Sequence, residues 1–416
     1  MMHALATGAS PENPESWETW LDGIHAAART RTSLVAPPVP DESWRYTRQK
    51  AFQTEPTNPG PAPRIQSSAR GWEAVGARGT PQLGSLSEAY AKNPGLLTGW
   101  FGRMARPEAR LLTALNAQAF VDGVFLFIPE GARLKNPIEI ILGRGTAPEP
   151  AFPRVLILLG AGSSCEVIER QDWKGIPEDT GKASSRPPRV VNSVTEIHLA
   201  HHAQLTHYVE PLGDPGVRPV SFTAVSLEEG STYRSFQFDG VGPLLRHEIE
   251  IRLEGTQAEA QVESLSLLGP REHRDRETQV IHATPKTRSE QRARSVVGAH
   301  ATAIYGGRVY IQPRAAGSSA LQDNHHLLLD PSACAMSRPE LEIGTDEVRC
   351  THGSKSGTLD RDALFYLKTR GIDPDEGRRL LIQGFTGAFL ALIPSALIQS
   401  RWQERIATFL SSTGAA

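Results

Sequence analysis

The sequence predicts a mainly β protein with helical regions at both ends, and three observations support this. From Phe120 onward, short strands of alternating apolar and polar residues recur for more than 200 residues, each broken by a small turn. Helical spacing is confined to the segments before and after that stretch, and helix-capping residues punctuate the last segment. We therefore expect an N-terminal helical and proline-rich region at residues 1–119, a β core at 120–358 and a C-terminal helical domain at 359–416.

The N-terminal region alternates between helical and proline-rich segments. Helical spacing from Trp17 to Ala28 is followed by APPVPDESWRYT, in which the prolines prevent a continuous helix or central strand. Much of residues 33–82 is therefore expected to be loop or linker. Helical spacing returns from Ser85 to Ala119, with interruptions at Pro94 and Pro107.

Units of strand, turn and strand make up the β core, for example RVLILLGAGSSCEVIER and HEIEIRLEGTQAEAQVESLSLL. One such unit cannot bury its apolar face alone, and stacking the units as coils of a solenoid would pair their strands in parallel. The same alternation also fits an antiparallel sandwich, so the pattern leaves both architectures open. The predicted turns centre on Gly131, Gly162, Ala203, Gly230 and Gly255.

The C-terminal domain carries clear helix boundaries. A helix from Asp360 to Arg370 is expected to end at Gly371, which suits the left-handed conformation, and Asp373 with Pro374 supplies the N-cap and first turn of the next helix. Two apolar stripes at helical spacing follow, and they would pack either on the β core or on a partner. The stripes are Leu381, Phe385, Ala388 and Leu392, and then Ile398, Trp402, Ile406 and Phe409.

Charge and hydropathy exclude several classes of function. The formal net charge of −2 does not indicate a nucleic acid as an obligate partner. No apolar run is long enough to cross a bilayer, and the N-terminus has neither the basic nor the apolar segment of a signal peptide. We expect a cytoplasmic protein with no membrane and no nucleic acid among its partners.

Several catalytic motifs are absent from the sequence. Without a G-x-x-x-x-G-K-[ST] phosphate loop, any ATP hydrolysis has to come from another chain. No C-x-x-C, H-E-x-x-H or G-x-S-x-G occurs either. Histidines cluster at His198, His201, His202 and His207, but alternation places them on both faces of a strand, so they cannot converge on one metal without a bend.

The three cysteines, an odd number, indicate reduced thiols rather than a disulfide framework. Cys165 is interpreted as structural because small buried cysteines are the commoner case, and Cys334, in SACAMS, because its neighbours are small and apolar. Cys350 and His352 share one face of a strand, roughly 6 to 7 Å apart. This pair fits two metal ligands, a nucleophile with its base, or ordinary packing residues, and as ligands it would supply only half of a tetrahedral site.

A long distinctive segment, RPELEIGTDEVRCTHGSKSGTLDRDALFYLKTRGI, is similar to the signature of the SufB/SufD family of iron–sulfur cluster assembly scaffold proteins. Its CTHG resembles the SufD form of this family in particular. Further matching segments, spread almost from end to end, are ESWRYT, ALNAQAFVDGVFLFIPEGARLKNPIEI, RETQVIHATPKTRSEQ and YGGRVYIQPRAAGSSALQDNHHLLL. The resemblance implies a right-handed parallel β-helix core flanked by N-terminal and C-terminal α-helical regions.

The resemblance also implies a function and partners. It implies a non-catalytic, SufD-like scaffold subunit of a SufB–SufC–SufD complex that assembles iron–sulfur clusters and passes them to apoproteins. A SufB-like subunit would bind through the β-helix. A SufC-like ATPase would hydrolyse ATP while bound to the C-terminal helices. This second contact favours a partner, rather than the β core, as the surface on which the second apolar stripe packs. The resemblance is also compatible with a homodimer of the isolated chain. The expected contacts with the ATPase are Leu364, Phe365, Leu381, Phe385 and Phe389.

Cys350 and His352 fall on family positions implicated in building a nascent cluster at the SufB–SufD interface. Cys350 would act as a thiolate and His352 as a neutral ligand or base, holding a transient iron–sulfur cluster shared with the partner. TPKTRS at 284–289 lacks a cysteine that many relatives have, so no ligand is expected there, and no motif indicates a flavin, although the resemblance is compatible with one. The alternatives are a sulfur-accepting SufB-like paralogue and a β-helix enzyme acting on polysaccharide.

Overall fold

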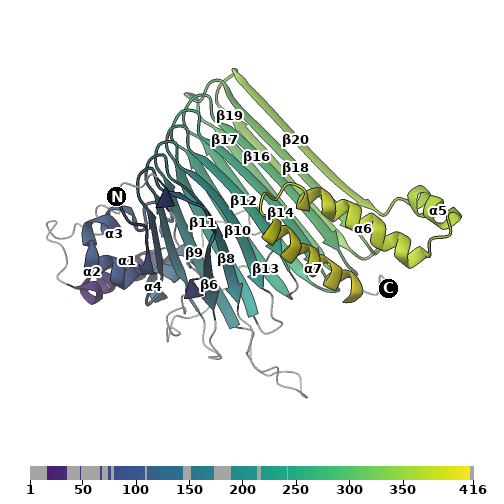
Figure 1. The fold of residues 1–416 in the computed structure, drawn as a ribbon, viewed down its shortest axis with the longest axis horizontal. Helices are drawn as coiled ribbons and strands as arrows, with labels where there is room; N and C mark the ends of the chain where they lie inside the picture. The colour runs from purple at the N-terminus through teal and green to yellow at the C-terminus, as the bar shows by residue number, and fades with distance from the viewer. Residues whose placement is uncertain are drawn as a thin grey trace, which may run out of the picture.

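The structure is a computed structural model of the chain (Figure 1). Among the residues it describes, no helix combines the length and the apolar character needed to span a bilayer. The residues that the structure describes are 16–34, 47, 66–67, 74–75, 79–107, 110–143, 151–172, 189–212, 217–240 and 242–412.

Two long sheets form the body of the molecule, and successive strands alternate between them from β6 onward. Sheet A has the strand order β1-β6-β8-β10-β12-β14-β16-β18-β20, and sheet B has the order β19-β17-β15-β13-β11-β9-β7-β4-β3. Among strands β4 to β20, every neighbouring pair within a sheet is parallel. Because each of these strands pairs with a strand one coil away, the fold is a parallel β-helix. The predicted solenoid is confirmed, and the antiparallel sandwich is wrong.

The strands lengthen along the chain, and the later ones stack nearly in full register. In sheet A they are β5 (Arg133–Leu134), β6 (Ile138–Gly143), β8 (Ser164–Asp172), β10 (Gln204–Leu212), β12 (Thr232–Asp239), β14 (Glu259–Leu268), β16 (Arg288–Val297), β18 (Ser318–Leu328) and β20 (Val348–Thr358). In sheet B they are β4 (Val124–Ile128), β7 (Arg154–Leu159), β9 (Arg189–Leu199), β11 (Val217–Leu227), β13 (Leu244–Leu253), β15 (His273–His282), β17 (Thr302–Ile311) and β19 (Cys334–Ile343).

Three short strands precede the solenoid and were not expected. β1 (Gln66–Ser67) pairs antiparallel with β6, β2 (Ala74–Val75) with β5, and β3 (Gln82–Ser85) with β4. Two- to four-residue strands carry too little periodicity to be recognised in a proline-rich sequence. Most of the remaining part of the predicted linker at 33–82 lies outside the described residues.

Left-handed residues mark the turns from sheet B to sheet A and stack on one another. Positive φ occurs at Gly131, Gly162, His202 and Gly230, close to the predicted turn centres. Each of the turns donates a backbone hydrogen bond to the next coil, as from Gly162 N to His201 O at 2.8 Å. Gly255 has a different role, because a Cβ there would lie 1.9 Å from the backbone nitrogen of Glu229. The turns therefore set the close spacing of the coils.

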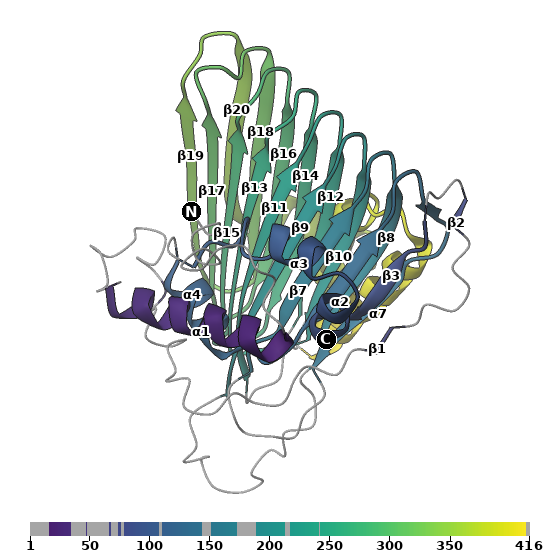
Figure 2. The same cartoon turned by 90° about the vertical axis from the view of Figure 1, so that its left-hand side faces the viewer.

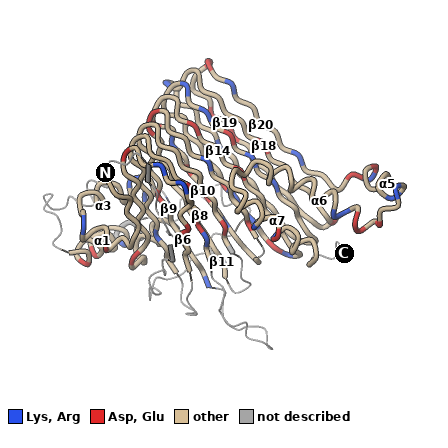
Figure 3. Tube along the Cα trace, viewed as in Figure 1, with Lys and Arg blue, Asp and Glu red and all other residues tan. Residues whose placement is uncertain are grey.

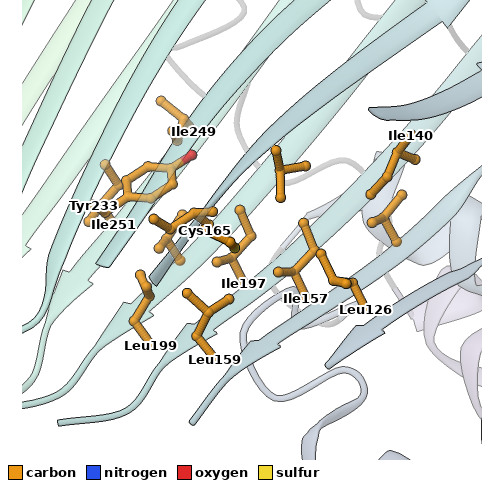
Figure 4. Close-up of a cluster of buried hydrophobic side chains, with 14 of the residues drawn as sticks. Leu126, Ile140, Ile157, Leu159, Cys165, Ile197, Leu199, Tyr233, Ile249 and Ile251 are labelled. Atoms are coloured by element: carbon orange, nitrogen blue, oxygen red, sulfur yellow. The ribbon is translucent and has the colours of Figure 1, made fainter. Parts of the chain in front are cut away.

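The interior between the two sheets is apolar in the early coils (Figure 4). Strands alternate strictly, so every second residue points inward and meets its partner from the opposite sheet. Ile140 and Leu142 of sheet A thus share a cluster with Ile157 and Leu159 of sheet B. Cys165 lies in the same cluster at 5% exposure, which confirms its structural interpretation.

The N-terminal helices cover the sheet B side of the first coils (Figure 2). They pack around an aromatic cluster that includes Trp20, Tyr90, Phe101 and Phe120. Asn116 fastens the last helix to the sheet, because its amide donates to Pro153 O at 3.0 Å and to another backbone carbonyl at 2.8 Å. These helices are α1 (Trp17–Leu34), α2 (Leu86–Lys92), α3 (Pro94–Trp100) and α4 (Leu111–Ala119).

The C-terminal helices begin and end as predicted, and two of them pack on the outer face of sheet A (Figure 1). Asp360 and Asp373 cap helices with their side chains, and Gly371 has a φ of 81°. The helices are α5 (Arg361–Thr369), α6 (Pro374–Leu390) and α7 (Ala396–Ser412). Figure 3 shows α5, which carries charges of both signs, projecting beyond the sheets.

The first predicted apolar stripe is rotated on the helix. Ala388 and Leu392 are exposed, whereas Ile382, Phe389 and Ile393 are buried against the solenoid. Helical spacing fits both sets, and only the contact with the sheet decides which face is covered.

The second predicted stripe lies entirely in the core, so assigning it to a partner is wrong. Its members are buried with Tyr208, Phe236 and Phe238 of sheet A. Trp402 stacks between Phe238 and Phe389, at centroid distances of 5.4 and 5.7 Å. Packing on the β core was the other placement that the sequence allowed for this stripe.

A buried carboxylate fixes α7 to the sheet. Glu210 on β10 accepts the indole N–H of Trp402, and it lies 3.5 and 3.4 Å from the guanidinium groups of Arg401 and Arg405. Arg170 on β8 adds a third cation at 3.4 Å. Since a buried carboxylate needs such partners, the network defines where α7 docks.

Candidate functional site

The last coil of the solenoid has no coil stacked on it. In the described part of the chain, β20 pairs only with β18, and β19 pairs only with β17. We call the end formed by β19 and β20 the open end. Each of these strands offers one row of unpaired backbone N–H and C=O groups, which is a template for another strand.

Cys350 and His352 lie on β20 at the open end and point into the solenoid. In the parallel register Cys350 stands over Ala320 and His352 over Gln322, both of which are buried inward-facing residues of β18. Cys350 packs at the edge of an apolar cluster that contains Val309. His352 is exposed because no further coil covers it. The predicted pair therefore shares one face, and that face is the interior one.

The surroundings of Cys350 favour the thiol over the thiolate. Partial burial raises the pKa of Cys350, and a backbone hydrogen bond with Ala320 only partly opposes this. Burial disfavours the charged form of a thiol. The thiolate expected as an iron ligand would therefore need a metal that displaces the proton, or a base such as His352.

Cys350 and His352 supply two potential metal donors from one face of β20. Across the described residues, no group of three or more histidine, cysteine, aspartate or glutamate side chains is arranged to hold a metal ion. A thiolate and an imidazole suit zinc, copper or iron, but they leave at least two positions of a tetrahedral site to be filled. Geometrically, the pair offers two potential donors on one face of β20.

The other histidines that the sequence singled out do not all converge on one site. His198 lies outside sheet B and stacks on Trp100, whereas His207 is inside the solenoid, 3.0 Å from the hydroxyl of Tyr233. His201 and His202 lie in a turn. His198 and His201 both approach the carboxylate of Glu228, at 3.4 and 3.1 Å, whereas His207 lies apart from them inside the solenoid.

Cys334, at the start of β19, is half-buried rather than enclosed. It stands beside Thr302 of β17 at the open end. The sequence interpreted it as structural because its neighbours are small and apolar, and the structure gives it less cover than that interpretation expected. Its exposure follows from its position on the last coil.

Under His352 lies a column of inward-facing residues, polar except for Val262, that the sequence pattern does not reveal. Counting coil by coil, Ser235, Val262, Gln291 and Gln322 occupy successive positions below His352. Gln291 and Gln322 are each 1% exposed. The coils differ in length, so these residues have no constant spacing in the sequence, and only the strand register reveals the column.

The outer face of sheet B holds a cavity of about 170 Å³ lined by paired charges. Arg110 forms an ion pair with Glu248, and Arg338 donates to both carboxylate oxygens of Glu277 at 3.0 and 3.1 Å. Burial raises the pKa of Glu277 to about 8, the Asp275 carboxylate adds to the rise, and the nearby arginines oppose it. The ion pairs occupy the cavity walls, so we assign it no ligand.

The residues expected to bind the ATPase differ widely in exposure. Phe365 on α5 is 69% exposed, whereas Phe389 is 1% exposed and lies in the packing of α6 on the sheet. Leu381 and Phe385 are half-buried, and Leu364 packs toward Gly377 at the contact between α5 and α6. Phe389 is therefore corrected to a core residue, while Phe365 is available to a partner.

Comparison with known proteins gives concordant matches. Residues 142–385 match the SufBD core domain of the SUF system of FeS cluster assembly, and residues 78–140 match the SufBD protein N-terminal region. These two matches span helices α2 to α4, the solenoid, α5 and most of α6, whereas α1 lies outside them.

Among similar proteins, an iron–sulfur cluster assembly SufBD family protein of Synechocystis is 27% identical over 290 residues, 70% of this chain and 64% of that protein. The iron–sulfur cluster assembly protein SufD of Escherichia coli is 28% identical over 189 residues, 45% of each chain. SufB of Bacillus subtilis is 22% identical over 310 residues, 74% of this chain and 64% of SufB. The matched regions span less than two thirds of each of these relatives. With a core-domain match over more than half of its length, the chain belongs to the SufBD family of the SUF system for iron–sulfur cluster assembly.

Proposed function

We propose that this chain is a SufD-like scaffold subunit whose open end forms one half of a site for building iron–sulfur clusters. The observation that carries the proposal is the position of Cys350 and His352, which project inward on the terminal strand. A partner chain with its own ligands would complete the coordination, and the cluster is cargo that leaves again. Cytoplasmic assembly with a SufB-like and a SufC-like subunit follows from this role.

The open end supports a heterodimer through the β-helix. The free edges of β19 and β20 suit the addition of strands from a SufB-like partner, which would extend both sheets and cover the end of the core. Strand addition at these edges would also bring partner side chains over Cys350 and His352. An isolated chain has the same free edges, so a homodimer would use the same surface.

Iron binding at the half-site has a defined proton balance. Cys350 enters as a thiol because of its raised pKa, so coordination to Fe²⁺ forms an iron–sulfur bond and releases one proton to water or to a base. His352 contributes a neutral ring nitrogen without releasing a proton. With only two ligands from each chain, opening the interface would remove half of the coordination, which supports release of the cluster to an apoprotein.

The site proposal is tested by reconstitution. The complex of this chain with its partner subunits is loaded anaerobically with iron and sulfide, and both are assayed. We expect Cys350→Ala and His352→Ala to reduce iron and sulfide per complex, while Cys165→Ala, which changes a buried thiol far from the open end, leaves loading unchanged. Full loading of both site variants would refute the site.

The proposed ATPase partner has its best-supported contact on α5. Phe365 and Tyr366 are 69% and 56% exposed on this helix, and exposed aromatic side chains of this kind commonly anchor interfaces. Because α6 and α7 are fastened to sheet A, a force applied at α5 would reach the solenoid through packed helices. No phosphate-loop motif occurs in this chain, so the partner would hydrolyse the ATP.

Point substitutions test this docking more cleanly than deletion of residues 373–416, which would expose the buried outer face of sheet A. We expect Phe365→Ser to weaken co-purification with a SufC-like ATPase. Leu397→Ser is the matched control, since Leu397 is also exposed, at 55%, but lies on α7. Equal retention of the ATPase by both variants would remove α5 from the interface.

A further inference from the structure

We propose that Gln322 is a positioning residue for His352. The side-chain carbonyl of Gln322 accepts the N–H of one ring nitrogen of His352 while the other ring nitrogen of His352 binds metal. The inference rests on the proposed function and assigns a role to a residue that neither the motif nor the comparisons single out. It concerns how the ligand is oriented, so it is testable with metal alone.

The first observation is the strand register between β18 and β20. Gln322 of β18 is the residue directly paired with His352 of β20, and both point into the solenoid. Paired residues on neighbouring strands are separated by about 4.8 Å, and a glutamine side chain spans such a gap. Gln322 therefore forms the floor beneath His352.

The second observation is that Gln322 is buried without a partner. It is 1% exposed, yet neither its Nε2 nor its Oε1 has a hydrogen bond in the structure. A buried amide without partners is unfavourable, because no hydrogen bond compensates for the loss of its contacts with water. Native proteins retain such groups rarely, and a role at a binding site is one established reason.

The neighbours of Gln322 leave its amide free for this role. Asn324, the next inward residue on β18, donates to Ser337 Oγ at 2.7 Å, and His326 bonds to the same hydroxyl at 3.0 Å. Across the interior, Gly307 makes room, because a Cβ there would lie 3.2 Å from Gln322 Nε2. The amide thus occupies a space that glycine keeps open.

The coordination chemistry of histidine suits an amide carbonyl as the acceptor of its second ring N–H. A metal-bound histidine uses one ring nitrogen as ligand and nearly always donates the other N–H to a carboxylate, carbonyl or water. This second contact fixes the tautomer and the ring orientation. Gln322 Oε1 is an unengaged acceptor at the paired position, so it supplies the carbonyl in that arrangement.

The experiment measures the affinity of the full-length chain for Zn²⁺ alone, by competition with a chelating dye. We expect Gln322→Leu to weaken binding about 10- to 100-fold, the usual loss when a supporting partner of a ligand is removed. Gln291→Leu is the matched control, because Gln291 is equally buried one coil deeper. Gln322→Glu keeps an acceptor and should restore most of the affinity.

A spectroscopic readout separates positioning from stability. In the Zn²⁺-bound wild-type chain, nitrogen-15 NMR should show a ring N–H of His352 that resists exchange with water, and this signal should be lost in Gln322→Leu. Equal affinity of Gln322→Leu and wild type, or equal losses in Gln322→Leu and Gln291→Leu, would overturn the inference.

The two proposals fail in different ways. If Cys350→Ala and His352→Ala bind Zn²⁺ as wild type does, the proposed site is wrong and the role of Gln322 falls with it. If those variants lose binding and Gln322→Leu does not, only the role of Gln322 is overturned.

Discussion

Cys165 and Cys350 occupy the two ends of one inward-facing column and differ in what covers them. From Cys165 the strand register leads through Leu205, Tyr233 and three further coils to Cys350. Cys165 is enclosed, and burial raises its pKa to about 12, whereas Cys350 lies on the last coil and is half-buried. The same inward position is thus a core position in one coil and a surface position in another.

This difference predicts selective alkylation. Thiol reagents attack the exposed thiolate, so iodoacetamide at neutral pH should modify Cys350 and leave Cys165 unmodified in the folded chain. Mass spectrometry of the peptides measures both. Cys334, also half-buried, serves as the comparison thiol. Modification of Cys165 at the rate of Cys350 would contradict the burial described here.

Glu277 predicts a pH dependence of stability. Its pKa is raised to about 8 in the folded chain by burial, from an ordinary value of 4.5. Between about pH 4.5 and 8, the Glu277 carboxyl is therefore protonated in the folded state and ionised in the unfolded state. By linkage, Glu277 lowers the free energy of unfolding as pH rises through this window, by up to about 1.4 kcal/mol per pH unit.

Glu277→Gln tests this dependence, because the amide cannot ionise but keeps an acceptor for Arg338. Urea unfolding between pH 6 and 8 should show a shallower loss of stability in the variant than in wild type. Identical slopes for both chains would show that Glu277 does not carry this proton.

At the scale of elements, helix boundaries could be predicted and helix faces could not. The caps at Asp360, Asp373 and Gly371 are local, so the sequence alone located α5 and the start of α6. The covered face of α6 depends on sheet A, which is distant in sequence. The docking role of Phe389 was implied by the family resemblance, and only the packing of α6 on the sheet shows that this residue lies in the core.

The packing of α7 predicts a large loss on truncation of its central tryptophan. Trp402 is fully buried, stacks on two phenylalanines and donates to Glu210. We expect Trp402→Ala to reduce the free energy of unfolding by about 3–5 kcal/mol, through the cavity and the unpaired carboxylate.

Denaturant unfolding measures the effect, with Leu397→Ala on the same helix as the control. Leu397 is 55% exposed, so its truncation should cost less than about 0.5 kcal/mol. Similar losses for the two variants would mean that α7 does not pack on the sheet as described.

At the scale of the whole molecule, the turn pattern indicated repeating units but could not order them. A strand and a turn look alike in a sandwich and in a solenoid, and the resemblance to the SufB/SufD family favoured the latter. The column that sets Gln322 beneath His352 depends on stacking coils of unequal length, so local pattern could not reveal it. The pair at 350 and 352 was found because both residues lie on one strand.

The shape of the molecule supports the proposed half-site. Helices cover the first coils and the outer face of sheet A, whereas β19 and β20 end the solenoid without a cover in the described part of the chain. Cys350 and His352 lie on that last coil. A second chain that extends the sheets would both close the core and complete the ligand set.

The most direct measurement compares iron and acid-labile sulfide bound per chain after anaerobic reconstitution, for this chain alone, for its complex with a SufB-like partner, and for the same complex carrying His352→Ala. We predict stable loading in the wild-type complex, little in the chain alone, and a marked loss in the variant complex. Undiminished loading of the variant complex, or a full cluster on the chain alone, would contradict a half-site at the open end.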